Sequence, residues 1–346
     1  MKAISKKAVR KAGEFLRGDD HSDSVRTKQA FDALAAWRSA HAVHLNNFNS
    51  WIRGKVGRLY DNPIIAQRLK RFESIVAKLM ANPDMQLDRM QDIAGMRVVL
   101  ESIGDTYDLF HRVCAASGDR ELVRLKDYID APKPDGYRSI HLVFKCRSQS
   151  NPEVDDLMVE LQIRTRLQHI WSTAYETLGT VLHTVFKRGE GEEPYRAYFR
   201  VVSALFSLVE GQPVLEACKG MSKEELIEDL RMLEEELRVI QLLRSAALTA
   251  DCIEANNYAD AAYHVVELDS DARIANIYAY TAKQLNAAEA FYAMREFETR
   301  DDPSFSVVLV SVGDVKELQR AYPNYFMDTQ SFINRLERLL GTRESS

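Results

Sequence analysis

The chain has few cysteines, few histidines and no long apolar run. Its 346 residues include 4 Cys and 8 His. The cysteines, Cys114, Cys146, Cys218 and Cys252, stand apart, with no Cys-x-x-Cys pair and no His at metal-ligand spacing. This scatter argues against a zinc-binding module or a disulfide framework, and it indicates reduced thiols in a cytoplasmic protein.

No membrane-spanning or secretory segment is indicated. No apolar stretch approaches the roughly 18 residues that a membrane span needs, and the opening MKAISKKAVRKAGEFLRG has charges with no apolar segment behind them. We therefore expect a soluble, cytoplasmic protein with no membrane partner. With 46% hydrophobic residues, the chain can bury a core of two domains or of one elaborated domain.

The net charge of −5 is unevenly distributed. Residues 1–80 hold 16 Lys or Arg against 7 Asp or Glu, whereas residues 221–300 hold 8 against 16. A basic N-terminal surface could meet the phosphates of nucleotides or RNA, which the acidic part would repel. Ordinary solvated helix faces would give the same counts, so charge alone does not decide the partner.

The periodicity predicts helices first and then a mixed α/β core. Apolar side chains at helical spacing predict one helix over residues 25–60 and a second over Ile64 to Met80. Short β-branched or alternating runs then predict strands at Met96 to Leu100, His141 to Lys145 and Leu157 to Ile163. These strands and their connections indicate a mixed α/β core from about residue 60 to 185.

The rest of the chain is expected to be mostly helical. SKEELIEDLRMLEEELRVIQLLRSAALTA opens with a serine capping-box pattern. ADAAYHVVELDSDA and AAEAFYAMREFETRDDP form a weak repeat that is compatible with helical hairpins of the tetratricopeptide sort or with an ordinary helical bundle. The strand-like run at Phe305 to Val312 stands alone among helices, and we expect it to join the edge of the core sheet or a second subunit.

Polar side chains follow one face of a predicted core strand. In LMVELQIRT, alternation places Glu160, Gln162 and Arg164 on the same face. Such groups are costly in a core unless they meet ligands, so the pattern suggests a cation at Glu160 and phosphate at Arg164. Asp92, just before the strand that carries Arg97, would supply the second carboxylate that an oxygen-preferring Mg²⁺ needs.

Two further segments carry groups suited to nucleotides. QRLKRFESIVAKL presents several cations on a predicted helix, which is a weak signal by itself. In DYIDAPKPDGYRSIHLVFK, two prolines and a glycine stand beside Tyr137 and several cations, and this composition is typical of a ligand loop. An aromatic face suits a purine base, and the cations suit its phosphates.

In this order, RLKRFESIVAKL, DIAGMR, KDYIDAPKPDGYRSIH and ELQIRT resemble the synthetase domain of the RelA/SpoT family, the enzymes that make (p)ppGpp. The resemblance covers roughly residues 60–185. It implies an α+β, nucleotidyltransferase-like fold, a mixed β-sheet flanked by helices. The sequence pattern beyond it predicts a mostly α-helical C-terminal region with one isolated strand. The domains would be 1–59, a basic helical region; 60–200, the synthetase domain; and 201–346, a helical extension.

The resemblance also assigns roles to residues. Glu160 and Asp92 would be catalytic and hold Mg²⁺, with Glu160 activating the acceptor hydroxyl. ATP would contact Arg68, Lys70, Ser74, Lys78, Arg97 and Arg164, with its adenine between Arg68 and Arg97. The acceptor nucleotide would contact Lys126, Lys133, Asp135, Tyr137, Arg138, His141 and Gln162, with its base on Tyr137.

The implied reaction is transfer of the β,γ-pyrophosphate of ATP to the 3′ hydroxyl of GDP or GTP. Asp135 stands where the family usually has Asn, which leaves the acceptor open: toxin-type relatives use adenine nucleotides or the tRNA 3′ end. An inactive nucleotide-binding module is a further alternative. The sequence has no His-Asp dipeptide, so a hydrolase domain is not expected. A homo-oligomer and intramolecular regulation by the C-terminal region both stay open.

Overall fold

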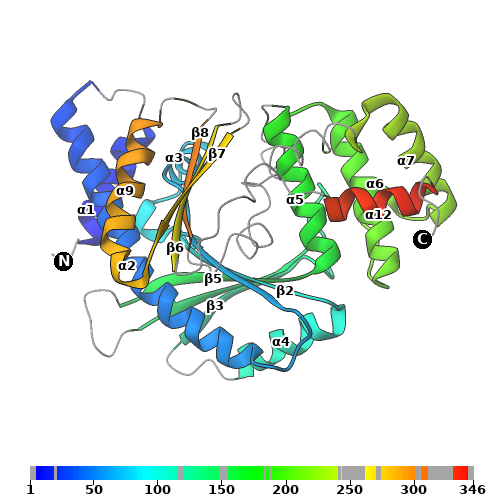
Figure 1. The fold of residues 1–346 in the computed structure, drawn as a ribbon, viewed down its shortest axis with the longest axis horizontal. Helices are drawn as coiled ribbons and strands as arrows, with labels where there is room; N and C mark the ends of the chain where they lie inside the picture. The colour runs from blue at the N-terminus through cyan, green and yellow to red at the C-terminus, as the bar shows by residue number, and fades with distance from the viewer. Residues whose placement is uncertain are drawn as a thin grey trace.

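One mixed β-sheet organises the molecule (Figure 1). The computed structural model describes residues 5–18, 22–115, 120–147, 155–182, 184, 186, 189–240, 243, 262–269, 274–300, 302, 305–310 and 330–341. Within these residues the sheet has 8 strands in the order β3-β4-β5-β2-β1-β8-β6-β7. β2 and β5 are parallel, and the other neighbours are antiparallel. The predicted α+β class, a mixed sheet flanked by helices, is confirmed.

The strands are β1 Ile64–Leu69, β2 Ala94–Leu100, β3 Arg120–Asp127, β4 Ile140–Cys146, β5 Leu157–Thr165, β6 Tyr263–Asp269, β7 Ile274–Tyr280 and β8 Phe305–Val310. The α-helices are α1 Lys6–Arg17, α2 Ser24–Val56, α3 Phe72–Ala81, α4 Ile103–Ala115, α5 Arg166–Val181, α6 Glu193–Val209, α7 Lys223–Leu237, α9 Leu285–Glu298 and α12 Gln330–Leu340.

Helices α2 and α4 cover one face of the sheet. Leu45, Phe48 and Ile52 of α2 pack with Leu109 and Val113 of α4 against the apolar side chains of β2, β4 and β5. The alternation in β5 places its apolar residues in this core, and it turns the polar side chains to the opposite face. The three strands predicted at β2, β4 and β5 are confirmed, and the candidate site lies on the face that these helices leave uncovered.

The helix predicted from Ile64 to Met80 is wrong in its first part. Residues Ile64–Leu69 form strand β1, which pairs along its length with β2. The main-chain N–H of Lys70 then donates to Ile93 O at 2.7 Å, and helix α3 begins only at Phe72. The buried run Ile64, Ile65 and Ala66 fills a central position in the sheet, and this tertiary pairing overrides the helical spacing.

The C-terminal region contains more strand than the sequence predicts. The capping box at Ser222 is present at the start of α7. The helical-hairpin repeat is wrong: its first unit contains strand β6, whose β-branched Val265 is buried, whereas its second unit is helix α9. The ends of that first unit, and residues 241, 242 and 244–250 of the expected long helix, lie outside the described residues.

The strand predicted near Phe305 is present as β8 and joins the edge of the core sheet at β1, as expected. It pairs with β6 over six residues and meets β1 at Arg68↔Val310. It is accompanied by β6 and β7, so it is not isolated; residues 311–312 lie outside the described part. The boundary predicted between residues 200 and 201 falls within α6.

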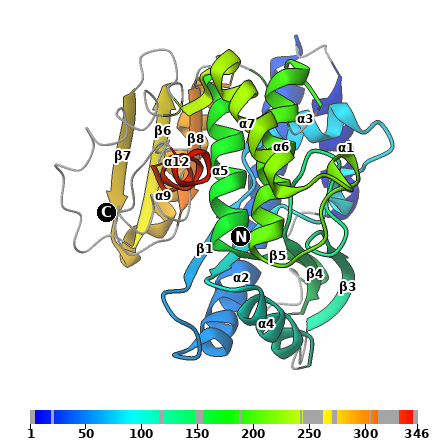
Figure 2. The same cartoon turned by 90° about the vertical axis from the view of Figure 1, so that its right-hand side faces the viewer.

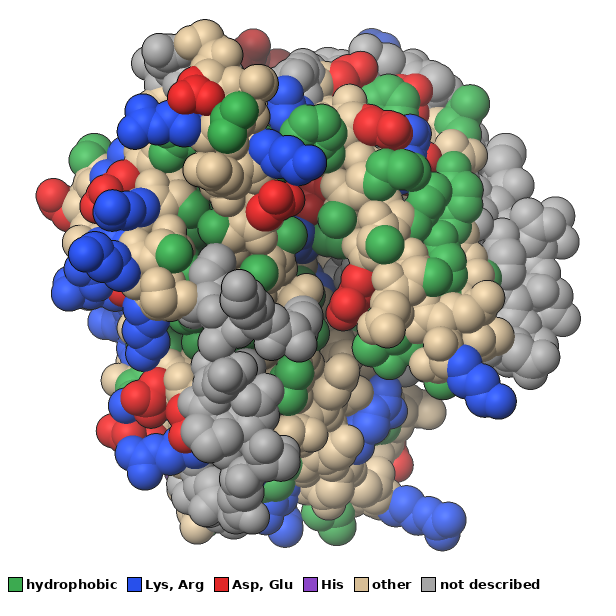
Figure 3. All heavy atoms as spheres, turned by 90° about the vertical axis from the view of Figure 1, so that its left-hand side faces the viewer, with side chains coloured by type: hydrophobic (Ala, Val, Ile, Leu, Met, Phe, Trp, Pro, Cys, Tyr) green, Lys and Arg blue, Asp and Glu red, His purple; other side chains and the backbone are tan. Residues whose placement is uncertain are grey.

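The C-terminal region therefore lies in two separate places in the molecule. Helices α7 and α12 pack with α5 and α6, whereas β6 to β8 and α9 extend the edge at β1 (Figures 1 and 2). On the face that carries α1, α2 and α9, Lys and Arg side chains are interspersed with Asp and Glu (Figure 3). The basic and acidic parts of the chain thus meet without forming one large patch of a single sign.

Two observations bear on the expectations about thiols and membranes. Cys114, Cys146 and Cys218 are free, and burial raises the pKa of each thiol, so none is activated as a thiolate. Cys252 lies outside the described residues. Among the helices described, none is both long enough and apolar enough to cross a membrane.

Glu73, in the first turn of α3, gives a prediction about stability. Burial and the neighbouring Glu296 raise its pKa to about 7 from 4.5. The native state therefore holds a proton that the unfolded state releases, and stability falls as the pH rises through this window. We expect Glu73→Gln to stabilise the protein by about 1–3 kcal/mol at pH 8 and by less at pH 5, measured by urea unfolding.

The matched control is Glu235→Gln, at an exposed position on α7. It should change the free energy of unfolding by less than about 0.5 kcal/mol at either pH. A Glu73→Gln protein with the same stability advantage at pH 5 and pH 8 would show that Glu73 titrates normally.

Candidate active site

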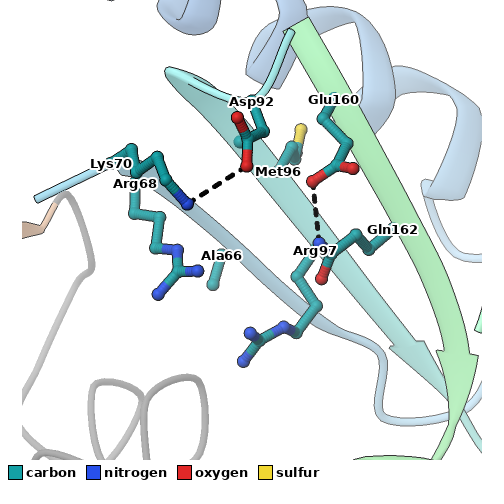
Figure 4. Close-up of a pocket in the computed structure, with 9 residues that line it drawn as sticks. Ala66, Arg68, Lys70, Asp92, Met96, Arg97, Glu160 and Gln162 are labelled. Atoms are coloured by element: carbon teal, nitrogen blue, oxygen red, sulfur yellow. Dashed lines mark hydrogen bonds and ion pairs between the residues drawn. The ribbon is translucent and has the colours of Figure 1, made fainter. Parts of the chain in front are cut away.

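A pocket opens on the uncovered face of the sheet where β1, β2 and β5 lie side by side (Figure 4). Its lining combines carboxylates, guanidinium groups and an ammonium group with small or apolar residues. The lining residues are Ala66, Arg68, Lys70, Asp92, Gly95, Met96, Arg97, Glu160 and Gln162. Six of the predicted site residues therefore meet here, although they come from segments up to 94 positions apart.

Asp92 lies just before β2 and is held by two lysines. Its Oδ2 accepts from Lys70 Nζ at 3.1 Å and from Lys78 Nζ at 2.8 Å. Burial of the carboxylate would raise its pKa, but the two ammonium groups outweigh burial and lower the pKa to about 2. Asp92 is therefore ionised at any physiological pH, as a metal ligand must be.

Glu160 is at the centre of a hydrogen-bonded chain on the neighbouring strand β5. His141 Nδ1 donates to its Oε1 at 3.0 Å, and Gln162 Nε2 donates to its Oε2 at 2.8 Å. The other ring nitrogen of His141 lies 2.9 Å from the Tyr137 hydroxyl. Burial would raise the pKa of Glu160, but the hydrogen bond and charge of His141 outweigh it, so the pKa is lowered. The result is an oriented carboxylate.

Guanidinium groups gather beside these carboxylates. β1 and β2 are paired so that Ala66 lies opposite Arg97 and Arg68 opposite Gly95. The side chains of Arg68 and Arg97 project to the same side, with Ala66 between them (Figure 4). Burial, then the charges of Arg97 and Arg68, lower the pKa of Arg164 well below its usual range. Because a guanidinium stays charged in proteins, this environment is unfavourable until an anion binds.

Helix α3 brings two more of the predicted residues toward the carboxylates. Ser74 and Lys78 are four positions apart on α3 and so share a face of the helix. Lys78 reaches Asp92, as described above, and Ser74 lies one turn earlier. The prediction that both residues are helical is confirmed, whereas Arg68 is on β1 and Lys70 follows it directly.

The predicted ligand loop presents aromatic rings to a cation. Lys133 Nζ lies 4.8 Å from the ring centroid of Tyr128 and 4.7 Å from that of Tyr137. Tyr137 is only 7% exposed, and the Lys133 ammonium group occupies part of the space beside its ring. Asp135 Oδ1 accepts from the main-chain N–H of Tyr137 at 3.0 Å. An Asn side chain can accept the same bond, so this contact does not distinguish the two residue types.

Gly136 is required by the way the loop packs. Its φ of +96° favours glycine, and a Cβ there would lie 2.8 Å from Cβ of Ser203 and 3.2 Å from Trp171. Ser203 Oγ also donates to Gly136 O at 2.6 Å. The loop is therefore fixed against α5 and α6 just before Tyr137.

The structure gives Arg138 buried contacts of its own, whereas Lys126 stays beside another predicted acceptor residue. Arg138 is 3% exposed, and its three guanidinium nitrogens contact Ile129 O, Pro213 O and Ser203 Oγ. These contacts favour a structural role, that of tying the loop to α6. Lys126 is exposed on the edge strand β3, beside His141 in the register.

Sequence reasoning missed some of the residues around the pocket. Ala66, Gly95 and Met96 line it but carry no chemistry that a motif search would select. Small residues at 66 and 95 leave room between the arginines, and only the pairing of β1 with β2 makes this visible. Tyr128 could have been found as the second aromatic residue of the loop. His169 Nδ1 lies 2.6 Å from Arg164 Nη2, which fits a supporting role for this histidine.

The carboxylates fit a divalent cation that is shared with phosphates. Asp92 Oδ1 is buried and has no hydrogen-bond partner within the described part of the chain, and Asp92 and Glu160 influence each other electrostatically. No group of three or more Asp, Glu, His or Cys suited to a metal occurs among the residues described. Mg²⁺ commonly has one or two protein carboxylates and completes its octahedron with water and phosphate oxygens.

The mixed sheet carries two carboxylates among clustered guanidinium and ammonium groups, an arrangement suited to phosphates and a divalent cation. Residues 67–189 match the family model described as "Region found in RelA / SpoT proteins". The chain therefore contains a RelA/SpoT region, as its motifs predict.

The matching relatives include named small pyrophosphokinases. The chain is 38% identical over 120 residues to GTP pyrophosphokinase YwaC of Bacillus subtilis, covering 32% of this chain and 56% of that protein. It is 33% identical over 116 residues to GTP pyrophosphokinase YjbM of the same organism, covering 33% and 54%. The chain spans about half the length of these curated relatives. A solved structure, small alarmone synthetase 2 from Bacillus subtilis, is 26% identical, with a TM-score of 0.44 over 52% of this chain and 94% of that one.

Proposed function

We propose that this protein transfers the β,γ-pyrophosphate of ATP to the 3′ hydroxyl of a guanine nucleotide, GDP or GTP, with Mg²⁺ as cofactor. The observation that carries the proposal is the pocket itself, in which Asp92 and the oriented Glu160 lie beside Arg68, Lys70 and Arg97. The names of the two Bacillus pyrophosphokinases support the same reaction class. Release of AMP balances the transfer.

Each part of the pocket has a task in this reaction. Arg68 and Arg97 would hold the adenine between their guanidinium planes, and Lys70, Ser74, Lys78 and Arg164 would contact the phosphates. Glu160, oriented by His141 and Gln162, would take the proton of the attacking hydroxyl. Asp92 and Glu160 would hold Mg²⁺, which offsets negative charge on the transferred group when bound.

The lysine contacts of Asp92 have a consequence for ligand binding. Both ammonium groups now neutralise the carboxylate. The phosphates of ATP compete for the same ammonium groups, so ATP binding would release Asp92 toward the cation. The positive guanidinium cluster would meanwhile lose the electrostatic penalty that the ligand-free site carries.

The proposal is tested by incubating the purified protein with γ-labelled ATP, Mg²⁺ and one acceptor at a time: GDP, GTP, ATP or tRNA. Label in guanosine tetraphosphate or pentaphosphate, with release of AMP, is the expected result. Label on an adenine nucleotide or on the tRNA 3′ end would support the toxin-type alternative. Nucleotide binding with no transfer to any acceptor would support the inactive binding module.

Tyr137 gives a second test, directed at the acceptor. Stacking of a base on an aromatic ring contributes about 1–3 kcal/mol. We therefore expect Tyr137→Ala to raise the KM for the acceptor by about tenfold to a hundredfold, while the KM for ATP changes less than about threefold. Initial rates with each nucleotide varied separately measure the two effects.

Tyr137→Phe is the matched control because it keeps the ring and removes only the hydroxyl that contacts His141. Its KM for the acceptor should stay close to that of the wild type. Equal losses for both nucleotides in Tyr137→Ala would mean that the loop does not hold the acceptor base.

A further inference from the structure

Helix α3, which places Lys78 beside Asp92 of the pocket, takes the acceptor for its first N–H group from a distant segment of the chain. Its N-cap residue is Arg71, which makes no side-chain capping hydrogen bond. The first N–H groups of a helix need such acceptors, and a carboxylate there is also favoured by the helix dipole. The N–H of Phe72, at the first position of the helix, donates instead to Oε1 of Glu296. Glu296 is on α9, 224 residues further along the chain.

Glu296 is itself held firmly in this position. Its Oε2 accepts from Arg38 Nη1 at 2.7 Å, and both side chains are about 5% exposed. Arg38, on α2, also donates to the hydroxyl of Tyr292 and lies 4.6 Å from the centroid of that ring. The carboxylate accepts from both the Arg38 guanidinium and the Phe72 amide, and these two contacts fix its position relative to α3.

Aromatic rings pack around the same contact between α2, α3 and α9. The rings of Phe31 and Phe72 stack with centroids 4.4 Å apart, and Phe297, next to Glu296, meets Phe31 edge-on at 5.4 Å. Phe72 is 8% exposed. Helices α2, α3 and α9 thus meet at one buried contact, and two of the three helices belong to the N-terminal part of the chain.

Helix α3 connects this contact between α2, α3 and α9 to the pocket. Phe72 begins α3, and six residues later Lys78 Nζ contacts Asp92 Oδ2 at 2.8 Å. On the other side of Arg71, Lys70 contacts the same carboxylate oxygen. Any displacement of the N-terminus of α3 therefore moves both lysines relative to Asp92.

We propose that Glu296 is a positioning residue of the active site: from the C-terminal region it caps α3 and so holds Lys78 and Ser74 in place for the phosphates of ATP. This inference rests on the proposed function. It assigns to the α9 segment a part in ATP binding, since the Glu296 carboxylate accepts the first N–H of a helix whose N-cap residue makes no capping hydrogen bond. Glu296 touches neither substrate and acts only through α3.

The experiment compares Glu296→Ala, Glu296→Gln and Glu298→Ala in the full-length protein. Glu296→Ala removes the acceptor of the Phe72 N–H, so we expect the KM for ATP to rise about tenfold, with the KM for the acceptor within about twofold. Glu296→Gln keeps an oxygen acceptor and should recover most of this loss. Glu298, exposed two residues further on α9, is the matched control and should show no change.

A readout independent of turnover accompanies the kinetics. Isothermal titration of Mg²⁺-ATP should show the same tenfold weakening in Glu296→Ala, and hydrogen exchange should accelerate at the first amides of α3 more than in α5. If Glu296→Ala does not fold, Glu296→Asp, which withdraws the carboxylate by one methylene, takes its place with the same expectations.

The outcomes separate this inference from the proposed function. A wild-type protein that transfers pyrophosphate, together with a folded Glu296→Ala protein of unchanged ATP affinity, would overturn the positioning role alone. Equal losses for ATP and the acceptor, without rescue by Gln, would also overturn it. A wild-type protein that neither binds nor uses ATP would remove the proposed function and this inference together.

Discussion

Glu160→Gln should abolish pyrophosphate transfer while leaving the fold intact. Glutamine keeps the size of the side chain and its place between His141 and Gln162, but it can neither take a proton nor offer a carboxylate to Mg²⁺. Loss of a general base alone lowers rates about 10²–10⁴-fold, and loss of a metal ligand adds to it. Turnover with γ-labelled ATP under saturating nucleotide measures the effect, and circular dichroism verifies the fold.

Glu121→Gln, at an exposed position on the edge strand β3, is the matched control and should retain wild-type turnover. Near-normal turnover by Glu160→Gln would remove Glu160 from the chemistry. The affinity for ATP measured without Mg²⁺ should change little in this variant, because the side chains assigned to the phosphates are untouched. A large loss of ATP binding would therefore point to a collapsed pocket.

A chain that ends at Gly220 should aggregate. The truncation removes α7 and α12, whose Leu226, Leu230, Phe332 and Leu336 are fully buried against α5 and α6. It also removes β8 from the edge of β1, which leaves unpaired main-chain groups on a central strand. Exposed apolar surface and an open sheet edge are the two features that most promote association.

Soluble yield and size-exclusion chromatography, with the full-length chain as control, measure this outcome. The sequence left open whether the C-terminal region restrains the enzyme or completes its core. A soluble, monomeric truncated protein that is more active than the full-length chain would establish restraint. The buried Arg38 and Glu296 pair and the shared sheet favour a region that completes the core.

Local chemistry allowed much of the site to be predicted. Alternation in LMVELQIRT placed Glu160 and Gln162 on one face, and both line the pocket. Asp92 was recognised as the second carboxylate because it stands directly before a strand. The composition of the segment around Tyr137 marked a loop, and the structure places its aromatic rings beside a lysine. In each case a few neighbouring residues carry the signal, so no distant contact is needed to read it.

Other features depend on partners that are remote in the sequence. β1 was predicted as a helix, and it is a strand because β2 lies on one side of it and β8, 241 residues beyond, on the other. Arg138 was expected at the acceptor, and its guanidinium instead meets oxygen atoms of residues 129, 203 and 213. The local sequence is the same whether an arginine of the loop binds a ligand or attaches the loop to a neighbouring helix.

Side-chain spacing and residue chemistry are enough to predict the polar and apolar faces of the core strands, the start of α7 and the two carboxylates that line the pocket. The placement of the C-terminal strands in the same sheet as β1, and of Glu296 at the N-terminus of α3, depends on contacts between distant segments. A strand edge and a helix N-terminus present the same unsatisfied N–H groups wherever they occur. Which distant segment satisfies them is settled by the packing of the whole chain.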